Sequence, residues 1–160
     1  MQEQPEHPPV PQRHETVEER ADRNLVELLQ ELRVVQTGVQ IVFAFLLGVA
    51  FTPRFAQLSD AQQGVYVTAL LLTVVSSTVL ATPVALHRGL FHRGAKRRIV
   101  ELSTRLALVG LVFLALALNG VVLLLIDVVL GRAAAIAVTS ASMLMFAGLW
   151  FFLPWALRRS

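Results

Sequence analysis

Long apolar blocks are the feature that most constrains this chain. Three segments, residues 65–86, 106–130 and 133–153, are each predominantly apolar over about the 20 residues that an α-helix needs to cross roughly 30 Å of hydrocarbon. Hydrophobic residues make up 55% of the sequence and charged residues only 16%, too few charges for an ordinary soluble domain. We therefore predict an all-α fold, a helical bundle that spans a membrane.

A fourth span, residues 34–51, is less clear because it contains several polar residues. The distribution of Lys and Arg resolves it. With four spans and both termini cytoplasmic, twelve basic residues lie inside and only Arg54 and Arg132 lie outside. If this segment did not cross, the basic residues would be divided into eight inside and six outside. Because cytoplasmic loops are enriched in Lys and Arg, the sequence favours a four-helix transmembrane bundle with cytoplasmic N- and C-termini.

The chain divides into four parts. Residues 1–14 are rich in proline and poor in apolar residues, which predicts a disordered tail. Thr16 and Glu19 have the spacing of a capping box, so a helix should begin there. We predict a cytoplasmic amphipathic helix over residues 15–33, the four-span bundle over residues 34–155 and a short cytoplasmic tail over residues 156–160.

The apolar residues of the first helix follow a heptad pattern that continues from the charged region into the first span without a change of phase. They alternate in steps of four and three: Ala21, Leu25, Leu28, Leu32, Val35, Val39, Val42, Leu46 and Val49. This spacing predicts one long helix. It also suggests that the protein self-associates, as a homo-oligomer, or docks a membrane partner through its N-terminal helix.

Polar and small residues share a second face of the same helix. At 100° per residue they fall within a sector of about 80°: Gln30, Arg33, Thr37, Gln40, Ala44 and Gly48. We expect this face to contact protein, because an unpartnered amide in hydrocarbon costs several kcal/mol. Asn119, deep in the third span, is expected to bond to a neighbouring helix. An alternative is that Gln36, Gln40 and Asn119 line a path in a small-solute channel or transporter component.

The second span carries small residues at strict four-residue intervals, which predicts close packing against another helix, within one chain or between copies. They are Ala69, Thr73, Ser77, Ala81 and Ala85. Pro83 is expected to kink the same span. Asp127 and Arg132 flank the turn at Gly131 and are expected to form a solvated surface pair.

The loop between the second and third spans is strongly basic. Its candidate lipid-headgroup contacts are His87, Arg88, His92, Arg93, Lys96, Arg97 and Arg98. They suit anionic lipids, or they serve only as a topology signal. The two histidines are five residues apart and no carboxylate cluster accompanies them, so no metal site is predicted. No catalytic or nucleotide-binding motif is present. We therefore expect a non-enzymatic protein with no cofactor and no nucleic-acid partner.

Three stretches, "ERADRNLVELLQELRVVQTGVQIVFAFLL", "TPVALHRGLFHRGAKRR" and "LWFFLP", resemble an uncharacterised family of small four-span membrane proteins that is common in high-GC Gram-positive bacteria. The resemblance covers most of the chain after residue 15. It implies a multi-pass protein of the plasma membrane and supplies no activity. The sequence therefore predicts an integral membrane protein of unknown biochemical activity.

Overall fold

The computed structural model describes residues 16–90 and 96–157, and within these ranges the chain is all-helical apart from short connections. Four long helices form the described part: α1 (Val17–Ala50), α2 (Asp60–Leu90), α3 (Lys96–Leu130) and α4 (Arg132–Ala147). Each is, alone or with the short helices that follow it, long and apolar enough to cross a membrane. The four stretches are Arg23–Ala50, Asp60–Leu86, Val100–Leu130 and Arg132–Leu157. This agrees with the four spans expected from hydropathy.

Helix α1 begins at the capping box formed by Thr16 and Glu19. The Thr16 hydroxyl accepts a hydrogen bond from the Glu19 backbone N–H at 3.2 Å, and the Glu19 carboxylate accepts one from the Thr16 N–H at 2.8 Å. These bonds satisfy two of the free donors that every helix start leaves. The helix then runs for 34 residues without a break. At 1.5 Å per residue it is about 51 Å long, which is more than the roughly 30 Å of a hydrocarbon layer.

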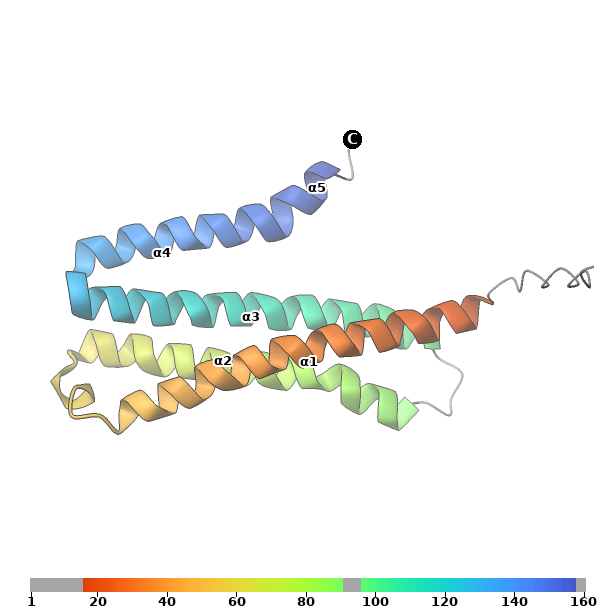
Figure 1. The fold of residues 1–160 in the computed structure, drawn as a ribbon, viewed down its shortest axis with the longest axis horizontal. Coiled ribbons are helices and arrows are strands. Elements are labelled where there is room, and N and C mark those ends of the chain that lie inside the picture. The colour runs from red at the N-terminus through yellow and green to blue at the C-terminus, as the bar shows by residue number, and fades with distance from the viewer. Residues whose placement is uncertain (1–15, 91–95, 158–160) are drawn as a thin grey trace, which may run out of the picture.

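Helix α3 lies in the middle of the molecule (Figure 1). Helix α2 packs along one side of it, α4 along the other, and α1 crosses both α2 and α3. A single 3₁₀ turn, η1 (Phe55–Gln57), lies in the connection from α1 to α2. Gly131 alone connects α3 to α4, with a φ of +87° that a residue with a Cβ rarely adopts.

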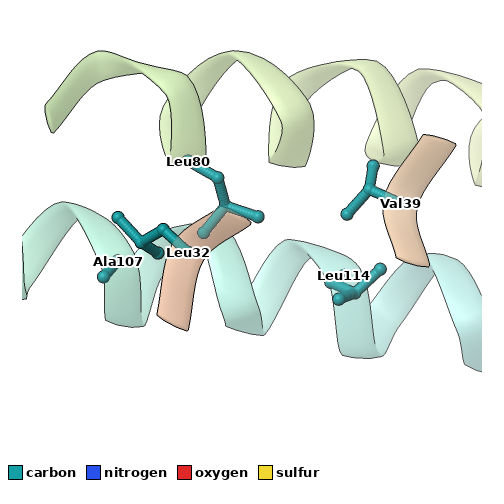
Figure 2. Packing of buried hydrophobic residues seen from close by; sticks show 5 residues of the cluster. All are labelled: Leu32, Val39, Leu80, Ala107 and Leu114. Carbon is teal, nitrogen blue, oxygen red and sulfur yellow. The ribbon is translucent and has the colours of Figure 1, made fainter. Parts of the chain in front are cut away.

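The core consists of two clusters along α1. In the first, Leu32 and Val39 of α1 enter the space between α2 and α3 (Figure 2), where they meet Leu80, Ala107 and Leu114. In the second, nearer the α1–α2 connection, Leu46 packs with Tyr66, Ala69 and Leu124. The Tyr66 hydroxyl donates a buried hydrogen bond of 2.8 Å to the Leu46 carbonyl. Helix α1 is therefore held to the bundle along most of its length.

Helices α2 and α3 approach closely because α3 carries glycine at their contact. A Cβ added to Gly120 would lie 3.1 Å from the Ala69 Cβ, and one added to Gly110 would lie 2.6 Å from Leu80 Cγ. At the same level the Ser76 hydroxyl donates to the Gly110 carbonyl at 2.8 Å. Close packing here depends on glycine in α3 as much as on small residues in α2.

Prolines lie near the ends of α2 and of the stretch that follows α4, and both stretches depart from a straight α-helix. Helix α2 continues through the fully buried Pro83 to Leu90, and it bends away from α3 over its last turns (Figure 1). Proline removes a helical hydrogen bond and accounts for this bend. Near the C-terminus, α4 passes into a π-helical turn, η2 (Gly148–Phe152), and then α5 (Leu153–Leu157), which contains Pro154. Helix α4 packs mainly on α3, and Ala135 is its one buried residue among those described.

Candidate functional site

The apolar seam of α1 packs inside the chain. Leu25, Leu32, Val39 and Leu46 are at most 6% exposed, and the alternate positions of the heptad from Leu28 to Val49 are half-buried. The seam therefore contacts α2 and α3 of the same molecule. The heptad was the reason to expect docking through this helix, and that surface is already covered. An intramolecular seam produces the same spacing, because the pattern shows that a face is buried and does not identify what buries it.

The polar face of α1 lies on the outside of the chain. Gln30, Arg33, Thr37 and Gln40 are all exposed, and no helix in the described part of the chain covers them. No contact of this face with protein is therefore formed within the described chain, and the expected helix–helix contact stays a prediction. The Thr37 hydroxyl is satisfied locally, because it donates to the Arg33 carbonyl at 3.1 Å. The Gln40 amide makes no hydrogen bond with any described residue.

Gln40 lies within the apolar stretch Arg23–Ala50 of α1, which is long enough to cross a membrane. It is ten residues before the end of the helix at Ala50, a rise of about 15 Å. The residue borders a groove of about 210 Å³ between α1 and α2. Its lining residues are Val39, Gln40, Phe43, Thr73, Val74, Ser77 and Thr78.

The groove contains four polar side chains, of which two are hydrogen-bonded and two, Gln40 and Ser77, have no partner among the described residues. The hydroxyls of Thr73 and Thr78 are the bonded ones: they donate to carbonyls one turn earlier in α2, at 2.8 and 2.9 Å. Such local bonds satisfy a threonine without a second helix. No hydrogen bond is formed by the side chains of Gln40 and Ser77 in the part of the chain that the structure describes. The groove therefore presents an unpaired amide and an unpaired hydroxyl between two helices that are each long and apolar enough to cross a membrane.

Small residues continue the face from Gln40 toward the end of α1. Ala44 and Gly48 follow at steps of four, and both are exposed. A Cβ added to Gly48 would meet nothing within 4 Å. Small residues at this spacing let two transmembrane helices approach closely. We call Gln40, Ala44 and Gly48 the open face of α1.

The small residues of α2 do not form one continuous contact. Ala69 and Thr73 are buried and Ser77 is half-buried, but Ala81 and Ala85 are exposed. The buried line continues instead through Ser76, Leu80 and Pro83. The physical reason is geometric: steps of four drift by about 40° per step around a helix, whereas alternating steps of three and four stay on one side.

Asn119 is 2% exposed and lies on the side of α3 opposite Gly110. It is nine residues from Gly110, half a revolution at 100° per residue, and Gly110 faces α2. Its amide nitrogen donates to the Ala115 carbonyl of its own helix at 2.8 Å, and its Oδ1 has no partner among the described residues. The expected interhelical bond is therefore not formed with any described residue. Since Gln40 faces outward from α1, the two amides do not line a common path within the chain.

The basic loop is largely outside the described residues. His92 and Arg93 lie in residues 91–95, which the structure does not describe. His87 and Arg88 belong to the backbone of α2, while Lys96, Arg97 and Arg98 begin α3, and their side chains are not described. The headgroup contacts therefore stay a prediction, as does the disordered tail over residues 1–14. Among the described residues, no cluster of His, Asp and Glu is suited to a metal ion.

Asp127, near the end of α3, is hydrogen-bonded to the starts of α2 and α4. Its Oδ2 accepts from Arg132 Nη1 and from Gln62 Nε2, each at 3.1 Å. The Asp127 side chain is only 9% exposed, whereas that of Arg132 is 55% exposed. The solvated surface pair expected from the sequence is therefore half-buried and involves a third residue. Gln62 was missed because it is 65 residues from Asp127 in the chain.

Comparisons with known proteins identify a family and supply no activity. No curated protein matches the chain, and no solved structure matches it. A family model does match, over residues 14–154, a range that includes all four long helices. Because that range covers most of the sequence, the chain belongs to a family of unknown function, DUF6328.

Proposed function

We propose that this protein is a non-enzymatic integral membrane protein that assembles within the bilayer, with a second copy docked on the open face of α1. The observation that carries the proposal is the Gln40 amide, exposed within the apolar stretch Arg23–Ala50 without a partner in the described chain. Four apolar helices and membership of a family of unknown function are compatible with such a role. The proposal moves the docking surface from the apolar seam to the opposite side of the same helix.

The energetic argument concerns the cost of leaving an amide in lipid. Transfer of an unpaired amide from water to an apolar medium costs roughly 2–7 kcal/mol. A hydrogen bond to another transmembrane helix recovers about 0.6–2 kcal/mol and removes the amide from lipid. Association through Gln40 is therefore favoured over exposure of the single chain to hydrocarbon.

A second copy is the occupant that the open face fits best. A glutamine amide both donates and accepts hydrogen bonds, so two Gln40 side chains related by a two-fold axis satisfy each other. Ala44 and Gly48 keep the surface beside Gln40 low, which permits the close backbone approach that this pairing needs. A helix of another protein would have to supply a matching amide or hydroxyl.

Cysteine crosslinking tests the proposal directly because the sequence contains no cysteine. Ala44→Cys places a thiol on the open face, and Phe45→Cys places one next to it in sequence but about 100° away, also exposed. In native membranes we expect oxidation to produce a disulfide-linked dimer from Ala44→Cys and little from Phe45→Cys. Adding Gln40→Leu to Ala44→Cys should reduce the dimer.

Three results would contradict this assignment. Equal crosslinking at positions 44 and 45 would indicate random collision, and no crosslinking at position 44 would place the second copy elsewhere. If native mass spectrometry of the complex released from native-lipid nanodiscs gave the mass of one chain plus one different protein, the occupant of the open face would be that protein and not a second copy.

We also propose that the protein resides in the plasma membrane with both termini cytoplasmic, as supported by the distribution of its basic residues.

A further inference from the structure

Two adjoining pockets lie where the α1–α2 connection meets the α3–α4 turn. The first, of about 160 Å³, is polar and is lined by Arg54, Gln57, Gln62 and Asp127 together with Leu58 and Val128. The second, of about 200 Å³, is almost wholly apolar and lies between the end of α1 and α3. Arg54, Leu58 and Val128 line both pockets. A polar site therefore opens beside an apolar one at the end of the membrane spans.

The polar pocket holds an arginine and a carboxylate that do not pair with each other. Arg54 Nη1 donates a hydrogen bond of 3.1 Å to the side-chain amide oxygen, Oε1, of Gln57, and Asp127 forms its ion pair with Arg132 instead. Arg132 and Gln62 both bind Oδ2 of Asp127, which leaves Oδ1 without a hydrogen-bond partner among the described residues. The Asp127 side chain is nevertheless 9% exposed, so this carboxylate belongs to a built site and not to a solvated surface.

We propose that the two pockets bind one aminophospholipid, with its headgroup in the polar pocket and an acyl chain in the apolar one. Arg54 contacts the phosphate, since a guanidinium binds phosphate oxygens through paired hydrogen bonds. Oδ1 of Asp127 accepts a hydrogen bond from the primary ammonium. The apolar pocket then receives the acyl chain along Leu125 and Val129, which are both exposed on α3.

The charges of the site predict a headgroup preference. Phosphatidylglycerol has the phosphate but no ammonium, so it leaves Oδ1 of Asp127 without a donor and beside a second negative charge. Phosphatidylcholine has a cation without N–H donors, so it cannot hydrogen-bond to the carboxylate. Phosphatidylethanolamine satisfies both residues. The expected preference for phosphatidylethanolamine is about tenfold, the value for one charge-assisted hydrogen bond.

Native mass spectrometry of the full-length protein in detergent measures this preference. The three lipids, with identical acyl chains, are added at equal concentration and the retained fraction of each is compared. Arg54→Gln removes the phosphate contact, and Asp127→Asn removes the charge that attracts the ammonium. The matched controls are Arg33→Gln and Asp60→Asn, exposed residues that line neither pocket. We expect Arg54→Gln to reduce the retention of all three lipids, Asp127→Asn to remove the preference for phosphatidylethanolamine, and both controls to keep the retention and the preference of the unaltered protein.

A third variant tests the apolar pocket without disturbing the Asp127 interactions. Val129 is 73% exposed, so Val129→Trp fills the apolar pocket without overpacking the core. We expect it to reduce lipid retention, and we expect glycerophosphoethanolamine, which lacks acyl chains, to compete poorly. Equal retention of the three lipids, or retention unaffected by Arg54→Gln and Val129→Trp, would overturn the proposal. Binding of the free headgroup as tight as that of the lipid would overturn the lipid as occupant.

Discussion

Replacement of Gly110 by alanine tests the close packing of α2 on α3. A Cβ at this position would lie 2.6 Å from Leu80 Cγ and 2.7 Å from Leu80 Cδ2, well inside van der Waals contact. Leu80 is fully buried and cannot move into free space. The added methyl group therefore has to separate the two helices or force Leu80 out of its rotamer. Either movement also strains the hydrogen bond from Ser76 to the Gly110 carbonyl.

The expected effect combines two terms of opposite sign. Overpacking of a filled core costs about 1–3 kcal/mol. Alanine favours a helix over glycine by up to about 1 kcal/mol, which offsets part of that cost. Gly38→Ala gives the second term alone, because a Cβ at Gly38 would meet nothing within 4 Å. We therefore expect Gly110→Ala to be less stable than Gly38→Ala by about 1–3 kcal/mol.

The measurement is the free energy of unfolding in mixed micelles titrated with SDS, followed by circular dichroism. A double-mutant cycle with Leu80→Ala adds a second check. Leu80→Ala alone should cost about 2–5 kcal/mol, and in the Gly110→Ala background it should cost less by 1 kcal/mol or more, because it makes room for the new methyl group. If Gly110→Ala and Gly38→Ala had equal stability, and the cycle were additive, the close approach of α2 and α3 would be refuted.

Two further predictions concern the N-terminal cap of α1 and the orientation of the chain in the membrane. The backbone N–H of Thr16, and then its hydroxyl, donate to the Glu19 carboxylate and lower its pKa from the ordinary 4.5, so the cap stabilises α1 above that pH and is lost as the pH falls through the lowered pKa. Thr16→Ala should raise the Glu19 pKa toward 4.5 in an NMR titration, and an unchanged value would show that the hydroxyl does not contribute. For topology, a membrane-impermeant thiol reagent should label Ala56→Cys in intact cells, and Glu27→Cys only after permeabilisation. The reverse pattern would invert the proposed orientation.

The sequence was informative where the signal is local. Thr16 and Glu19 are three residues apart, and the bonds of a capping box form within one turn, so the start of α1 was predictable. The four spans follow from apolar length. The turn at Gly131 follows from the conformational freedom of glycine.

The parts that the sequence did not predict depend on which helix covers which face. A helical period shows that Gln40 and Thr37 share a side with Gly48, but not that this side faces away from the bundle. Ser76 and Ser77 are equally small and adjacent, and only the position of α3 selects Ser76 for the buried contact with Gly110. The hydrogen bond between Gln62 and Asp127 joins two residues that are 65 positions apart in the chain. Contacts of this kind require the assembled bundle.

The single-glycine connection between α3 and α4 bears on how the protein is tagged. With Gly131 as the one residue between them, the end of α3 and the start of α4 are held side by side. An epitope or fluorescent protein inserted at this turn would force the two helix ends apart. In the connection over residues 51–59, Arg54, Gln57 and Leu58 line the polar pocket, so a reporter there belongs at the exposed start of the connection, before Arg54.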